Sequence, residues 1–162
     1  MDVLILDLSS ASINGECQLT DYSNMIELLS FSHGVAQQIT GDQSNTKRTS
    51  GKPNHQDFTI TKYQDLSSCQ LVDYCNQAKN IPTVKVTIGQ NDSGKVNKIF
   101  IYELTNALIS SVSVGGGGGG KPQETVTFNY TKISWTYAAQ KSDVSDAGNT
   151  AATWNHATNA AS

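Results

Sequence analysis

Residues 98–137 read KIFIYELTNALISSVSVGGGGGGKPQETVTFNYTKISWTY, with runs of β-branched and aromatic residues on both sides of six consecutive glycines. Such residues favour strands, because their side chains fit a pleated, half-buried surface. Glycines this dense do not favour a strand, since glycine loses the most backbone entropy on ordering. We therefore predict two long antiparallel strands joined by a glycine-rich loop over residues 115–121.

The strand after this loop changes face. Its apolar residues alternate in one phase over 126–130 and in the opposite phase over 133–137. Side chains in a strand have a period of two, so a change of phase requires an extra residue or a bend. We predict a bulge near Thr131 and Lys132, a feature typical of barrels and of sandwich corners.

Length and composition narrow the class of protein. A chain of 162 residues predicts one domain, residues 1–162. The net charge of −3 and the 15% of charged residues exclude the basic surface of a nucleic-acid-binding protein. Cysteines 17, 69 and 75 are predicted to be free thiols in a reducing compartment. The N-terminal MDVLILDL predicts a first strand, with neither a signal peptide nor membrane insertion.

The remaining pattern is mostly strand. We expect one helix over residues 65–78, with Ser67 and Gln70 as a capping box. The expected strands are 3–8, 25–37, 56–63, 83–88, 98–104 and, after a tight return at Thr105-Asn106, 107–114.

Two of these strands have unusual faces. In 25–37, one face carries Leu29, Phe31 and Val35, whereas the other carries Ser30, Ser32, Gly34 and Ala36. The small polar face predicts a border with water, a cavity or a channel. Residues 98–104 are apolar on both faces. That strand is therefore either central with the helix above it, or covered on one face by another subunit.

Two segments show no strand or helix period. Residues 40–54 form an extended loop that is either an interaction loop or merely solvated. Residues 138–162 form a polar C-terminal tail, which we expect Trp154 to anchor to the body.

The sequence offers no catalytic site. Residues 115–121 match most of a phosphate-binding loop, but Pro122 stands where Ser or Thr would hold magnesium, and a strand follows instead of a helix. His33, His55 and His156 are scattered along the chain, without metal-ligand spacing. We therefore expect no enzyme activity, no catalytic residues, no cofactor and no metal.

The order and spacing of several segments resemble the hemolysin-coregulated protein (Hcp) family, which forms the tube of the type VI secretion system. The most specific is SSVSVGGGGGGKPQETVTFNYTKISWTY (110–137), with its glycine-rich loop and Glu-x-Val-x-Phe-x-Tyr-like strand. Supporting segments are IELLSFSHGVAQQ (26–38), HQDFTITKYQD (55–65), IPTVKVTI (81–88) and NGEC (14–17). The tail TWNHATN departs from the family at Thr153, where glycine is usual.

The resemblance implies a mainly β fold, a β-barrel of two packed antiparallel sheets with one flanking helix. It implies a homohexameric ring whose rings stack into a hollow tube that carries small effectors in its lumen. The implied partners are the spike protein (VgrG), the contractile sheath and the baseplate. The protein would be cytoplasmic before firing and then secreted by the machine itself. Too few residues follow Tyr137 for a fused toxin domain, so we expect a structural subunit.

The resemblance also suggests functional surfaces. Ser30, Ser32 and Gly34 would face the lumen and its cargo, unless they belong to an ordinary solvated strand face. Contacts between subunits or rings would involve Lys47, Arg48, Lys52, Ile99 and Ile101. The alternative function is a ligand-binding β-sandwich of lectin-like type.

Overall fold

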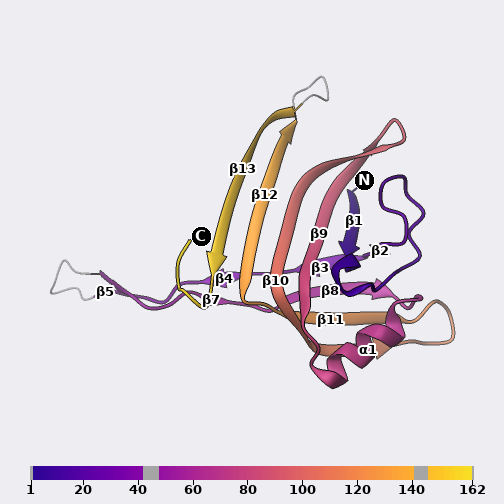
Figure 1. The fold of residues 1–162 in the computed structure, drawn as a ribbon, viewed down its shortest axis with the longest axis horizontal. Helices are drawn as coiled ribbons and strands as arrows, with labels where there is room; N and C mark the ends of the chain where they lie inside the picture. The colour runs from indigo at the N-terminus through magenta and orange to yellow at the C-terminus, as the bar shows by residue number, and fades with distance from the viewer. Residues whose placement is uncertain (1, 42–47, 141–145, 162) are drawn as a thin grey trace.

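The computed structural model describes residues 2–41, 48–140 and 146–161, most of which are β-strand (Figure 1). The helical segments among them are the 3₁₀ turn η1 (Ser9–Ala11) and the helix α1 (Ser68–Gln77). The strands are β1 (Asp2–Asp7), β2 (Ile26–Glu27), β3 (Ser30–Ser32), β4 (Val35–Ala36), β5 (Ile39–Gly41), β6 (Arg48–Ser50), β7 (Asn54–His55), β8 (Phe58–Tyr63), β9 (Ile81–Asp92), β10 (Lys95–Gly115), β11 (Gln123–Asn129), β12 (Lys132–Gln140) and β13 (Asp146–Asn155). The predicted mainly β fold is confirmed.

The strands form two antiparallel sheets that share β10. Sheet I has the order β2-β1-β9-β10-β12-β13, and sheet II has the order β10-β11-β8-β3. In Figure 1 the strands of sheet I rise toward the top, whereas β3, β8 and β11 run across the lower part of the molecule. The first part of β10 pairs with β9 and β12, and its last part pairs with β11.

The predicted tight return at Thr105-Asn106 is wrong, because β10 continues through it. Asn106 has a positive φ of 51° inside the strand. Asparagine tolerates this left-handed conformation better than most residues do, so the strand turns from sheet I into sheet II without reversing.

The predicted bulge near Thr131 and Lys132 is also wrong. The chain leaves sheet II at the end of β11 and enters sheet I at the start of β12, and between them Thr131 donates its backbone N–H to Thr105 O at 3.1 Å. This change of sheet accounts for the change of phase. The register shifts lie in β10, between Lys98 and Phe100 and between Ile109 and Ser111.

The expected strand over 25–37 is three short strands, because it changes partners. β2 pairs with β1, β3 with β8 and β4 with β7. Between β2 and β3, Leu28 donates to Leu4 O in sheet I at 3.0 Å, and Leu29 donates to Thr61 O in sheet II at 2.7 Å. The two sheets therefore meet again at this corner, although their hydrogen-bonded strand order is an open path.

The main core lies between the sheets and is closed below by α1. Its fully buried members include Leu6, Val86 and Leu104 of sheet I, Phe58, Ile60, Val126 and Phe128 of sheet II, and Leu71 of α1. A second, smaller core lies on the opposite face of sheet I, where Cys17 and Tyr22 of the loop 13–25 pack on Ile5. Thr87 of β9 is also buried there, at 4% exposure.

The helix starts later than predicted and has a different cap. Ser67 makes no side-chain capping bond, so the predicted capping box does not form. Instead the Asp65 carboxylate accepts from the Ser67 backbone N–H at 2.9 Å, and the Ser68 hydroxyl accepts from Asp65 N–H at 3.0 Å. The helix ends at Gln77, and its C-cap Ala78, with a left-handed φ of 49°, stops it before Pro82 is reached. None of the helices within the described ranges is long and apolar enough to cross a membrane.

Both segments without a predicted period contain strands. Within the expected loop, β5 pairs with β6, and together with β4 and β7 they form an arm that leaves the body on the left of Figure 1. The expected tail returns as β13, which pairs with β12 from Lys132 to Gln140. Trp154 is half-buried and packs against the main core, as predicted.

Candidate functional site

The outer face of sheet II carries two rows of hydroxyl side chains. Cross-strand pairing aligns Ser30 with Thr61, Thr61 with Thr125, and Thr125 with Ser113. The next row on the same face aligns Ser32, Thr59, Thr127 and Ser111. The residues between these rows point inward, because neighbours along a strand face opposite sides. We call this surface the hydroxyl face.

The hydroxyl face is polar but bears little charge. Ser111 donates to the Thr127 hydroxyl at 2.8 Å, so some of its groups satisfy one another. Asp57 lies at one border, and its carboxylate accepts from Ser110 at 3.0 Å and from the Asn129 amide at 3.0 Å. Such a surface can hydrogen-bond water and passing polar groups without strongly attracting either sign of charge.

Ser30 and Ser32 are exposed and belong to this hydroxyl face, as the alternation required. Gly34 lies beyond β3 and is half-buried, with the Gln56 side-chain oxygen 3.0 Å from the position that a Cβ would take. Gly34 therefore lies at the root of the arm, the place between β3 and β4 where the arm joins the body, and outside the two hydroxyl rows.

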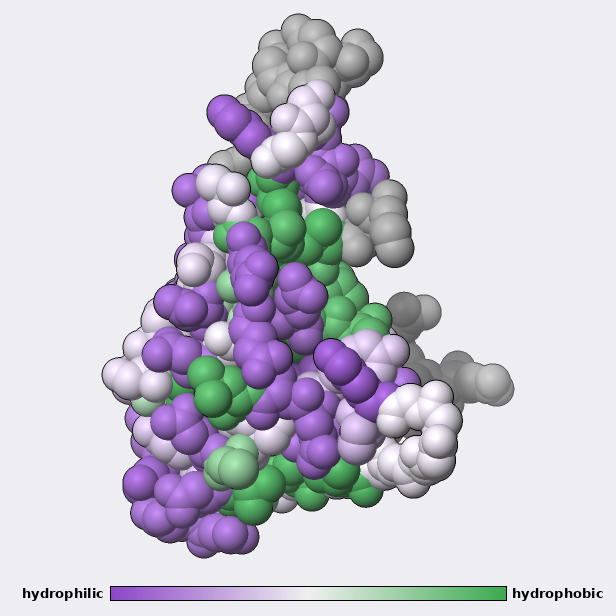
Figure 2. Space-filling view, turned by 90° about the vertical axis from the view of Figure 1, so that its right-hand side faces the viewer, coloured by the Kyte–Doolittle hydropathy of each residue, from purple (hydrophilic) through white to green (hydrophobic). Residues whose placement is uncertain are grey.

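Ile101 lies on the face of sheet I opposite the main core, Ile99 falls at the register shift between Lys98 and Phe100, and both are half-buried. Ile101 is aligned with Thr87 of β9 and Thr136 of β12, so β10 is central in the sheet. The loop 13–25 covers the neighbouring Ile5 on this face. Figure 2 shows the side of the molecule with α1 and the N-terminal elements, where apolar areas are divided by polar residues.

The other predicted contact residues belong to the arm. Lys47 lies outside the described residues. Arg48 opens β6, aligned with Gly41 of β5, and Lys52 is exposed between β6 and β7. The two described basic positions thus lie on the segment that extends farthest from the body (Figure 1).

A buried ion cluster joins sheet II to α1. The Lys62 ammonium, with no exposed side-chain surface, lies 2.8 Å from Glu124 Oε2 and 2.8 Å from Asp65 Oδ1. Ser68 of α1 donates to the same Glu124 oxygen at 2.9 Å. Glu124 is the glutamate of the Glu-x-Val-x-Phe-x-Tyr-like segment, so that motif position holds a structural ion pair.

The histidines that are scattered in the sequence lie close together in the fold. The rings of His55 and His156 are 4.4 Å apart, and those of His33 and His55 are 6.1 Å apart. The described residues nevertheless contain no group of three or more His, Cys, Asp and Glu side chains arranged to hold a metal ion. Sequence spacing missed this cluster because the histidines come from three separate segments.

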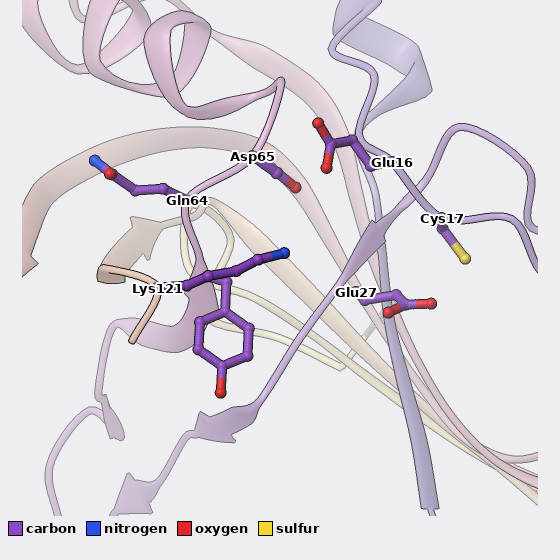
Figure 3. A pocket seen from close by; sticks show the side chains of 7 residues that line it. Glu16, Cys17, Glu27, Gln64, Asp65 and Lys121 are labelled. Carbon is purple, nitrogen blue, oxygen red and sulfur yellow. The ribbon is translucent and has the colours of Figure 1, made fainter. Parts of the chain in front are cut away.

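A cleft of about 240 Å³ lies beside the glycine-rich loop (Figure 3). Figure 3 shows the Lys121 side chain extending toward the space between Asp65, Glu16 and Glu27. Cys17 also lines the cleft, and burial, followed by the nearby charge of Glu27, raises the pKa of its thiol. The thiolate is the nucleophilic form of cysteine, and a raised pKa makes that form less available at neutral pH.

Comparison with known proteins identifies the class. Residues 6–137 match the family model described as "Type VI secretion system effector, Hcp". Protein hcp1 of Pseudomonas aeruginosa is 37% identical over 106 residues, which are 64% of this chain and 65% of that protein. The chain thus aligns with slightly less than two thirds of this relative.

Solved structures agree with the family match. A structure of a type six secretion system protein has a TM-score of 0.92 and 26% identity over 100% of both chains. The crystal structure of Hcp1 from Salmonella typhimurium has a TM-score of 0.81 over 99% of both chains, and its 21% identity is evidence for the fold alone. This chain belongs to the Hcp family of type VI secretion, and the resemblance found in its sequence is confirmed.

Proposed function

We propose that this chain is the tube subunit of a type VI secretion system. Six copies would close into a ring, and rings would stack into a hollow tube that carries small effectors. The observation that carries the proposal is the hydroxyl face: one sheet of an Hcp-family chain is apolar inside and covered by Ser and Thr outside. The arrangement suits the wall of a water-filled channel.

The weak charge of the hydroxyl face favours passage over tight binding. Uncharged hydroxyls exchange hydrogen bonds with water at little net free energy. Effectors of different charge could therefore occupy such a lumen and leave it. Ser30 and Ser32 are our candidates for cargo contact, whereas Gly34 would act through the root of the arm.

Subunit contact would use the opposite face of sheet I and the arm. Ile99 and Ile101 leave half-buried apolar surface that a neighbouring copy can cover. A closed ring requires a head-to-tail interface, in which one surface of a copy meets a different surface of the next. The arm, with Arg48 and Lys52 and with Lys47 beyond the described residues, is suited to reach an adjacent subunit or ring.

The family match suggests the wider setting. The tube would be tipped by the spike protein (VgrG), assembled on a baseplate and driven by the contractile sheath. The chain would be cytoplasmic before firing and extracellular afterwards. The raised pKa of the Cys17 thiol agrees with a structural role. The packing of Phe31, Tyr102, Trp135 and Trp154 against the main core disfavours the lectin-like alternative.

The proposal is tested by assembly. Size-exclusion chromatography with light scattering should give a species of six times the chain mass, and negative-stain electron microscopy should show six-fold rings with an open centre. A protein that stays a single chain at high concentration in mild buffer would overturn the proposal.

An aspartate at Ile101 is expected to abolish the ring, because a desolvated unpaired charge costs several kcal/mol. The measurement is the same light-scattering profile, with the urea midpoint recorded to show that the chain still folds. Ile101→Thr keeps the β-branched shape and should retain rings. Rings that persist in a folded Ile101→Asp protein would remove this face from the interface.

Replacing Ser32 by arginine is expected to leave the ring intact but to reduce co-purification of a cationic effector about fivefold. This ratio corresponds to a loss of roughly 1 kcal/mol in the free energy of effector binding. The matched control is Ser23→Arg, at an exposed serine of the loop 13–25. Equal retention of effector by the two variants would contradict a lumen position for Ser32.

A further inference from the structure

All three histidines of the chain meet where separate segments converge. His33 follows β3, His55 ends β7 and His156 follows β13. Figure 1 shows the end of β13 beside β4 and β7, at the root of the arm. The ring planes of His55 and His156 are 86° apart at 4.4 Å, so the two imidazoles are in direct edge contact.

The cluster lies among aromatic rings. The ring of His55 is 6.1 Å from Trp135 and 6.3 Å from Trp154, the latter nearly parallel at 17°. His33 is 5.6 Å from Phe58, and His156 is 5.3 Å from Tyr130. The surroundings are therefore apolar, which disfavours any charged form.

Hydrogen bonding in the cluster suits neutral imidazoles. Tyr130 donates its hydroxyl hydrogen to Gln56 O at 3.1 Å. His33 Nδ1 lies 3.3 Å from the Tyr130 hydroxyl oxygen and can therefore donate to that oxygen. His33 Nε2 and His55 Nδ1 are buried without a partner. A protonated imidazole has two N–H donors, and a buried donor without an acceptor is costly.

The charged and titratable groups around the cluster offer little compensation. The titratable groups that face the histidine cluster are Tyr130, which follows β11, and Tyr102 of β10. β12 and β13 contribute only the uncharged rings of Trp135 and Trp154. Asp57, next to β8, is engaged by Ser110 and Asn129. Burial lowers the pKa of each histidine. For His33 a hydrogen bond to the Gln56 backbone opposes this effect and His156 adds to it, whereas for His55 both His156 and His33 lower the pKa further.

The same residues hold the outer segments on the body. His55 is paired with Val35 in the β4–β7 ladder, and Gln56 donates to Gly34 O at 2.8 Å. His156 donates its backbone N–H to Thr131 O at 2.8 Å, which attaches the end of β13 to the turn between β11 and β12. Opening the cluster would therefore loosen both the arm and the β12–β13 hairpin.

We propose that His33, His55 and His156 form an acid-sensitive latch, which holds the arm and the β12–β13 hairpin on the body while neutral and releases them on taking up protons. The inference concerns the chain itself and goes beyond the tube function. The protons come from the solvent, and the released imidazolium groups gain water as their hydrogen-bond acceptor.

The sign of the effect follows from linkage. Each histidine has a lower pKa when the latch is closed than when it is open in water, so the open form binds more protons. The closed form is fully favoured above the ordinary histidine pKa of about 6.5 and loses its advantage as pH falls below it. For each histidine that takes up a proton only on opening, the opening equilibrium should rise about tenfold per pH unit in that range.

The test uses the chain's own two tryptophans, both of which touch the cluster. Acidification from about pH 8 to about pH 5 should change tryptophan fluorescence in a transition below about pH 6.5. Over the same range, hydrogen exchange should increase in residues 35–41, 48–55 and 146–156, while β8 and β11 remain protected. Histidine NMR signals give the three titrations directly.

The matched variant is His156→Phe, which keeps a ring but removes one titrating group. This substitution should raise the pKa of His55, because the repulsion from His156 disappears. It should also make the increase of hydrogen exchange with falling pH less steep. Three histidines titrating independently near 6.5 would overturn the proposal, as would titration with no increase in exchange at the arm. If the variant fails to fold, the wild-type exchange and NMR titrations still decide. None of these readings needs a ring, so failure of the latch and failure of the tube proposal are distinguishable.

Discussion

Replacing Lys62 by methionine is expected to lower the free energy of unfolding by about 3–5 kcal/mol, the usual effect of removing one partner of a buried ion pair. Lys62 is fully buried, and Glu124, with 1% side-chain exposure, would lose its counter-ion. The Lys62 ammonium also donates to Tyr63 O at 3.1 Å, and this bond would be lost too. Urea unfolding followed by circular dichroism measures the change.

A double variant separates the charge effect from packing. In Lys62→Met with Glu124→Leu, both buried charges are gone, and Asp65 retains access to water at 13% side-chain exposure. Buried pairs replaced by apolar residues are often neutral or more stable, so the double variant should recover most of the loss. A single variant within about 0.5 kcal/mol of the wild type would show that the ion pair is not a stabilising element.

The ion pair also connects Glu124 of the Glu-x-Val-x-Phe-x-Tyr-like strand to α1, which lies far from that strand in the sequence. Glu124 is the second residue of β11, the strand that follows the glycine-rich loop, and it accepts from Ser68 in the first turn of α1. Loss of Lys62 should therefore raise hydrogen exchange at the start of α1 before it does so in β9. The effect would distinguish a local loss of the helix anchor from general loosening.

The inward residues of sheet II were predictable, because period two is a local property of a strand. Val126 and Phe128 alternate in the sequence and are fully buried. The same rule indicated a polar face at Ser30 and Ser32. It could not indicate their partners on the face, since alignment with Thr61 and Thr59 depends on register between strands far apart in the chain.

Gly15 shows a different limit. The sequence Asn14-Gly15 reads as a turn, whereas a Cβ at Gly15 would lie 2.5 Å from Met25 O and 2.7 Å from a side-chain carbon of Ile26. The glycine is required by close packing of two segments, and its N–H donates to Asn24 O at 2.8 Å. Composition cannot distinguish a glycine needed for close approach from one needed for a turn.

The missed strand β13 and the missed histidine cluster have one cause. β13 has few large apolar side chains, and its backbone is held by the ladder to β12, which no local pattern reveals. His33, His55 and His156 meet only after that hairpin and the arm are in place. Long-range pairing thus created the features that local residue spacing could not predict.

Replacing Phe58 by alanine is expected to cost about 3–5 kcal/mol, because a buried ring is exchanged for a cavity between the two sheets. Phe58 is fully buried in sheet II, and its ring lies 5.2 Å from Tyr102 of sheet I and 6.0 Å from Phe31. The ring therefore connects both sheets at the level of β10. Thermal and urea unfolding should both report the loss.

The matched control is Thr59→Ala, one residue along the same strand but on the hydroxyl face. Since Thr59 is half-buried and aligned with Ser32 and Thr127 on the hydroxyl face, its loss should change stability by only about 0.5 kcal/mol. Phe58→Leu should fall between the two, because leucine fills part of the cavity. Equal losses at Phe58 and Thr59 would contradict the assignment of one face of sheet II to the core and the other to water, and with it the hydroxyl face on which the proposed lumen depends.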